Sequence, residues 1–103
     1  MPQNTFTVFW TRSAQNDLIE IIEHISFDSY SIANEKFIQI KRQAAKLENQ
    51  PARGRIVPEL LLYSIENYRE IIVSPWRMIY RIEGSNVYIV ALFDGRRKLE
   101  DIL

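Results

Sequence analysis

The sequence predicts an α+β domain: an N-terminal strand, an α-helical hairpin, then a three-stranded antiparallel meander, with all strands forming one twisted sheet. Two observations carry this prediction. In the first half of the chain, apolar residues recur at three- and four-residue steps, which is the spacing of amphipathic helices. The second half changes to short β-branched and aromatic runs separated by tight-turn signals, which is typical of neighbouring antiparallel strands.

The elements of the first half follow from local signals. A strand is expected at residues 5–10, where β-prone side chains alternate, and Thr11 or Ser13 can cap the helix that follows. Ser31 can cap a second helix, which is expected to end near Asn49 because a proline follows two residues later. The two apolar stripes are Leu18, Ile21, Ile22 and Ile25, and Ala33, Phe37, Ile40, Ala44 and Leu47.

The second half begins with a connecting loop at residues 51–58, around Arg53-Gly54-Arg55, and a short strand or turn at 60–64. Three strands are then expected, at residues 68–73, 77–83 and 86–93. The last strand is the most apolar and is therefore predicted at the centre of the sheet. Residues 99–103 are expected to form a short tail with one helical turn. The N-terminal strand must join the same sheet, because alone it would leave backbone groups unpaired, and the helical hairpin then covers one face.

Composition restricts the classes of function. The length of 103 residues suits one domain, assigned here to residues 1–103. The 13 basic and 13 acidic side chains cancel, which excludes a protein that holds nucleic acid through bulk positive charge. Without cysteine, and with His24 as the single histidine, we expect no metal site and no cofactor. No membrane span or signal peptide is visible, so the expected location is the cytoplasm.

Several segments, in this order and spacing, resemble the RelE/ParE toxin superfamily, and most of all ParE, the plasmid stabilisation toxin. Near the start is Phe9-Trp10-Thr11, and in the middle is Gln50-Pro51 followed by Gly54-Arg55. The others are Tyr68-Arg69-Glu70-Ile71, Trp76-Arg77-Met78-Ile79-Tyr80-Arg81-Ile82, Val87-Tyr88-Ile89-Val90 and Gly95-Arg96-Arg97-Lys98.

The resemblance implies the toxin of a type II toxin–antitoxin pair, with an antitoxin protein as cognate partner. ParE-like members are associated with inhibition of DNA gyrase, whereas RelE-like members cut messenger RNA on the ribosome. We therefore expect a ParE-like toxin that inhibits DNA gyrase by binding. The alternatives are a ribosome-dependent endonuclease and an inactive member that binds only its antitoxin. Asp94 departs from the many relatives that carry histidine just before the glycine.

Six cations are the candidate target- or antitoxin-binding residues, because a cluster of them could hold phosphates or an acidic protein surface. They are Arg69, Arg77, Arg81, Arg96, Arg97 and Lys98. The alternative is that they pair with Glu70, Glu83 and Asp94, or lie in solvent. The stems of Arg69 and Arg77 could also brace the sheet.

Catalysis is less well supported by the sequence. RNA cleavage needs a positioned acid and base, and residues 94–103 contain neither tyrosine nor histidine. The remaining candidates, Glu66, Glu70, Tyr68, Tyr80 and Asp94, each have a structural interpretation as core residue or arginine partner. His24 falls on the polar side of its helix and is expected in solvent. An antitoxin segment could add a strand at the exposed sheet edge.

Overall fold

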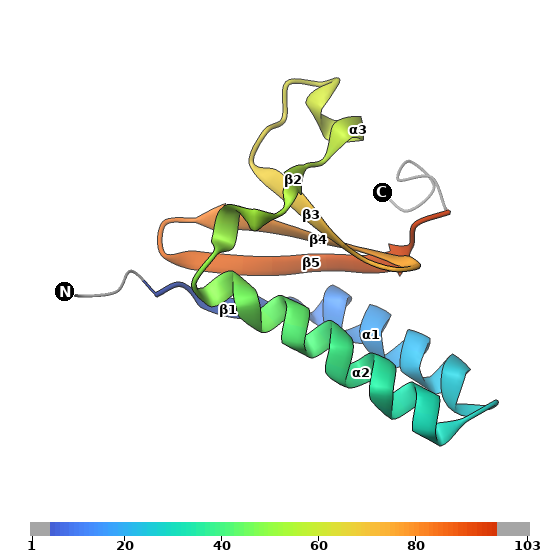
Figure 1. The fold of residues 1–103 in the computed structure, drawn as a ribbon. Helices are drawn as coiled ribbons and strands as arrows, with labels where there is room; N and C mark the ends of the chain where they lie inside the picture. Colours follow the sequence, from blue (N-terminus) through green and yellow to red (C-terminus); the bar gives the residue numbers. More distant parts are fainter. Residues whose placement is uncertain (1–4, 97–103) are drawn as a thin grey trace.

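Five strands, two long helices and one helical turn make up the fold, which a computed structural model describes for residues 5–96 (Figure 1). The strands are β1 (Thr7–Trp10), β2 (Arg55–Ile56), β3 (Tyr68–Val73), β4 (Trp76–Glu83) and β5 (Asn86–Asp94). The helices are α1 (Arg12–Ser26), α2 (Tyr30–Ala45) and α3 (Pro58–Leu61), with 3-10 turns at Lys46–Glu48 and Pro51–Arg53. The expected fold class is confirmed; the tail at 99–103 lies outside the described residues.

Side-chain hydroxyls cap both long helices at their N-termini. Of the two predicted candidates, Thr11 is the cap: its hydroxyl accepts a hydrogen bond from the backbone N–H of Ala14 at 3.2 Å. At the second helix the cap is Ser29, which accepts from the N–H of Ile32, and not the predicted Ser31. The reason is local geometry, because Ser29 keeps an extended backbone with φ −161°, whereas Ser31 already lies within α2.

The helical hairpin packs its two apolar stripes on one face of the sheet (Figure 1). Leu18, Ile40 and Leu47 are buried there, but Phe37 lies at the border of its stripe and stays 39% exposed. From the strands, Met78, Tyr80 and other side chains of the same face complete this core. Among the helices of residues 5–96, none is long and apolar enough to cross a bilayer.

The strand order is β1-β5-β4-β3-β2, so β4 is the middle strand and the prediction for β5 was wrong. The N-terminal strand does join the sheet, in parallel with β5, and β3, β4 and β5 form the predicted antiparallel meander. The centre shifts to β4 because β2, a two-residue strand inside the predicted loop, pairs with β3 at its outer edge.

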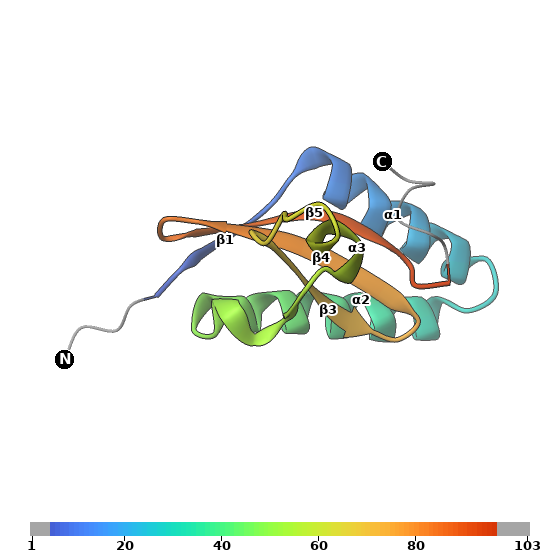
Figure 2. The same cartoon turned by 90° about the horizontal axis from the view of Figure 1, so that it is seen from above.

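The opposite face of the sheet is partly covered by α3, on the side away from the hairpin; Figure 2 shows α3 over the strands from above. Pro58 begins this helical turn, where a missing N–H costs nothing. Residues 58–61 are therefore helical, and the predicted turn is found at residues 62–64. Beneath α3, Val57, Ile79 and Phe93 form a second small core.

Candidate functional site

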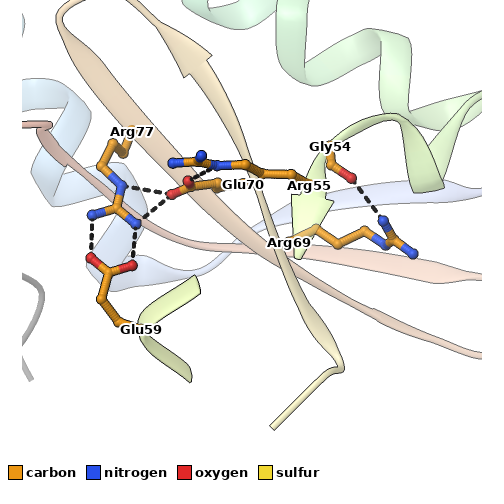
Figure 3. A network of polar contacts seen from close by, with 6 residues as sticks. All are labelled: Gly54, Arg55, Glu59, Arg69, Glu70 and Arg77. Atoms are coloured by element: carbon orange, nitrogen blue, oxygen red, sulfur yellow. Dashed lines mark hydrogen bonds and ion pairs between the residues drawn. The ribbon is translucent and has the colours of Figure 1, made fainter. Parts of the chain in front are cut away.

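Arg77 is held between two carboxylates and its side chain is only 9% exposed. It projects from β4 on the α3 side of the sheet. Its two terminal nitrogens donate to the Glu59 carboxylate at 2.7 and 2.8 Å, and its Nε–H donates to Glu70 at 2.6 Å (Figure 3). These hydrogen bonds, led by that to Glu59, raise the pKa of Arg77 above its ordinary value. The guanidinium charge is therefore neutralised within the protein.

Glu70 and Arg55 complete the same network (Figure 3). The Glu70 side chain is fully buried and accepts hydrogen bonds from both Arg77 and Arg55. The charges of two cations and two anions, contributed by β2, β3, β4 and α3, thus cancel. The ion pairs between these side chains attach α3 to the sheet. The interpretation of Glu70 as an arginine partner is confirmed. Glu59 was missed, because 18 residues separate it from Arg77 and no local spacing signals the contact.

Arg69 occupies the other face of the sheet, opposite Tyr80 in the β3–β4 register. Its Nη1 donates to the carbonyl oxygen of Gly54 at 2.8 Å (Figure 3). The same nitrogen donates to the carbonyl oxygen of Ala52 at 3.4 Å. The hydroxyl of Tyr80 holds the same turn, because it donates to the Pro51 carbonyl at 2.6 Å and accepts from the Gly54 N–H at 3.0 Å. Two side chains, Arg69 and Tyr80, therefore fix the backbone at residues 51–54 through four hydrogen bonds.

Arg53 adds a second positive charge beside this turn. Burial raises the pKa of Tyr80, while the Gly54 hydrogen bond and the charges of Arg69 and Arg53 lower it. Both guanidinium groups therefore lie near one phenol. In residues 5–96, neither arginine forms an ion pair with a carboxylate. Arg53 was not among the predicted site residues; the one available signal was its place in Arg53-Gly54-Arg55.

Arg81 and Arg96 form local ion pairs. Arg81 pairs with Glu83 at 2.6 Å and lies 4.8 Å from the ring centre of Tyr88. Arg96 pairs with Asp94, and its side chain is 84% exposed. Each acid is two residues from its arginine, so these contacts follow from the sequence itself. Exposed pairs of this kind contribute about 0–1 kcal/mol to stability.

The described arginines among the predicted site residues do not meet in one patch. Arg77 lies beneath α3, Arg69 lies at the turn before β2, Arg81 lies near the β4–β5 turn, and Arg96 follows β5. Arg97 and Lys98 lie outside the described residues. A binding role for these six cations stays a prediction.

The candidate proton-transfer groups are mostly engaged elsewhere. Glu70 is bound by two arginines, the Tyr80 hydroxyl donates to a backbone carbonyl, and Asp94 accepts from Arg96. Glu66 is exposed and Tyr68 packs against the second small core. Three of the five candidate groups, Glu70, Tyr80 and Asp94, are therefore already bound within the protein.

A groove of about 450 Å³ runs between α1 and the ends of β4 and β5. Ile21, Ile25 and Trp76 contribute apolar surface, and Glu20 and His24 contribute polar groups. His24 is exposed, as predicted, but it also lines this groove. Within residues 5–96, no group of three or more histidine, aspartate or glutamate side chains could hold a metal ion.

Acidification is expected to weaken the attachment of α3. The hydrogen bond from Arg77 lowers the pKa of Glu59 below its ordinary 4.5. The unfolded chain then takes up this proton at a higher pH than the folded chain. The stabilisation is present above pH 4.5 and is lost as the pH falls through the lower, folded-state pKa.

Melting curves of the wild type and Glu59→Gln between pH 7 and pH 3 test this expectation. The amide cannot titrate, so the advantage of the wild type, limited to about 1 kcal/mol by the partial exposure of Glu59, should shrink at low pH. A difference that stays constant over the whole range would contradict it.

Comparison with known proteins gives one family and several similar chains. Residues 8–99 match the family model described as the ParE toxin of the type II toxin–antitoxin system parDE. Toxin ParE3 of Caulobacter vibrioides is 27% identical over 93 residues, covering 89% of each chain.

Two solved structures share the fold. A chain of the chromosomal ParDE toxin–antitoxin system from P. aeruginosa has a TM-score of 0.72 at 20% identity, over 89% of this chain and 98% of that one. A chain of the toxin–antitoxin complex RelBE2 from Mycobacterium tuberculosis has a TM-score of 0.62 at 20% identity, over 87% and 91%. At these identities the two structures bear on the fold alone.

Proposed function

The chain belongs to the ParE toxin family, and from this premise we propose that it inhibits DNA gyrase by binding in the cytoplasm. It is the toxin component of a type II toxin–antitoxin system, and its cognate partner is an antitoxin protein. The association of ParE-like toxins with gyrase inhibition supports gyrase as the target. The mode of action, binding without covalent chemistry, rests on the residues of the chain itself.

The pairing of Arg77 with two carboxylates is the observation that supports a binding function over RNA cleavage. A site that cuts RNA needs cations that are open to phosphate oxygens and stabilise the charged transition state. Both sides of the Arg77 guanidinium are already occupied by carboxylates, and the half-buried Glu59 would repel an approaching phosphate. Arg69 keeps its charge, but its neighbour Tyr80 donates its proton to a backbone carbonyl.

Two assays with purified toxin test the proposal. We expect inhibition of gyrase-catalysed DNA supercoiling, relieved when the antitoxin is added first, and no codon-dependent cleavage of messenger RNA on programmed ribosomes. Relief by the antitoxin is the control, because it ties the inhibition to the toxin. Cleavage in the ribosomal A site would overturn the proposal. If the toxin neither inhibits supercoiling nor cleaves messenger RNA, the proposal is also overturned, and an inactive member that binds only its antitoxin is favoured.

A further inference from the structure

Arg53 and Arg69 keep positive charges that no carboxylate in residues 5–96 neutralises. The other arginines of the β3–β4 region are matched by acids, as Arg77 is by Glu59 and Glu70. Among the arginines of the β2–β4 region, those at the turn before β2 therefore keep an unmatched charge. We call Arg53, Arg69 and the adjoining Arg55 the β2 rim.

The rim is held in place before any partner arrives. Two backbone carbonyls orient the Arg69 guanidinium, and the buried hydroxyl of Tyr80 fixes the same turn through Gly54. A guanidinium held by carbonyl oxygens keeps its full charge and loses little further freedom on binding. Arg53 is exposed on the turn itself, so its side chain is free to reach an incoming anion.

The rim places arginine side chains on both faces of the sheet edge, although the charge of Arg55 is matched by Glu70. Arg55 is paired with Glu70 in the β2–β3 register, whereas Arg69 is one position along and faces the other side. Figure 3 shows the Arg69 guanidinium turned toward Gly54 and away from Glu59 and Glu70. The Arg55 side chain is 62% exposed although its Nε contacts Glu70. An extended segment that follows the β2 edge therefore meets arginines on either side.

We propose that the β2 rim binds an acidic segment of the antitoxin, whose carboxylates pair with Arg53 and Arg69. Nucleic acid is the less suitable anion, because tight binding to DNA usually needs many phosphate contacts, and the rim offers three arginines, one of them already paired with Glu70. Carboxylates match the guanidinium fork in geometry and need few contacts. The inference rests on the antitoxin partnership of the family and is independent of gyrase as the target.

Titration calorimetry with the antitoxin encoded beside the toxin gene tests the rim. The variants are Arg53→Glu and Arg69→Lys, and the matched control is Arg42→Glu, which reverses an exposed arginine on the outer side of α2. At low salt we expect Arg53→Glu to weaken binding about tenfold or more, and this loss to shrink at high salt because exposed charges are screened. Arg69→Lys should weaken it less, because the charge remains and only the fork is lost. The control should stay within about twofold of the wild type, since it lies off the proposed interface.

Three outcomes would overturn the inference. The first is an Arg53→Glu protein that binds the antitoxin as tightly as the wild type. The second is an equal loss of antitoxin affinity in Arg42→Glu, which would show that only the net charge of the toxin matters. The third is displacement of the antitoxin by a short DNA duplex that Arg53→Glu no longer binds, which would make the rim a phosphate site.

Gyrase assays on the same variants without antitoxin separate this inference from the proposed function. Arg53→Glu should inhibit supercoiling like the wild type, and a parallel loss of both activities would contradict an antitoxin-specific rim. If the wild type itself fails to inhibit gyrase while antitoxin binding still depends on Arg53, the proposed function fails and the rim assignment stands.

Discussion

Replacing Arg77 by methionine is expected to destabilise the protein by about 3–5 kcal/mol, because the change breaks a buried ion pair from one side. Glu70 would keep only Arg55, although its own side chain is fully buried. Glu59 would lose both hydrogen bonds that attach α3 to the sheet. In a domain of this size, such a loss lowers the melting temperature by roughly 15 °C or more.

The matched control is Arg81→Met, on the same strand and the same face. Its ion pair with Glu83 is exposed, so we expect a change below about 1 kcal/mol. Adding Glu70→Gln to Arg77→Met should recover part of the stability, because the uncompensated buried anion is removed. An Arg77→Met melting temperature close to that of Arg81→Met would contradict the network as described.

Alanine at Gly54 is expected to cost about 3 kcal/mol, for a steric reason. A Cβ atom there would lie 2.5 Å from the backbone oxygen of Glu70 and 2.7 Å from the Tyr80 hydroxyl. The backbone of Gly54 has ordinary extended angles, so lack of space and not conformational strain sets the effect. Either β2 moves off β3 or the hydroxyl is pushed aside, and overpacking of this kind is destabilising.

Thermal and urea unfolding of Gly54→Ala measures this cost, with Gly84→Asn as the control. Gly84 has φ +57°, but a Cβ atom added there would meet no atom within 4 Å, and asparagine tolerates this left-handed conformation. The control should therefore stay within about 1 kcal/mol of the wild type. If Gly54→Ala unfolds like the control, the close approach of the turn to β3 is not rigid.

The Gly54 substitution also connects stability with the proposed antitoxin surface. Gly54 accepts the hydrogen bond that orients Arg69, and it follows Arg53 directly. A folded Gly54→Ala protein is therefore expected to bind the antitoxin more weakly, in the same direction as Arg53→Glu.

Local chemistry in the sequence determined much of the architecture. The stripe spacing placed both long helices, the threonine hydroxyl began the first one, and the strand at residues 68–73 was predicted with its observed bounds. The family resemblance rested on segments along the chain and was confirmed by the match over residues 8–99. The signals for helices and strands depend on residues within one or two turns of each other, so they can be read without the fold.

Tertiary structure decided which arginine side chains are available to bind a partner. Arg77 and Arg69 look alike in the sequence, each within a β-prone run, but one contacts an acid 18 residues away and the other contacts a carbonyl 15 residues away. The same long-range pairing created β2 and moved the sheet centre to β4. An arginine remains a binding group only where no carboxylate reaches it. Which carboxylate reaches which arginine is set by strand register and burial, and neither is encoded in the spacing along the chain.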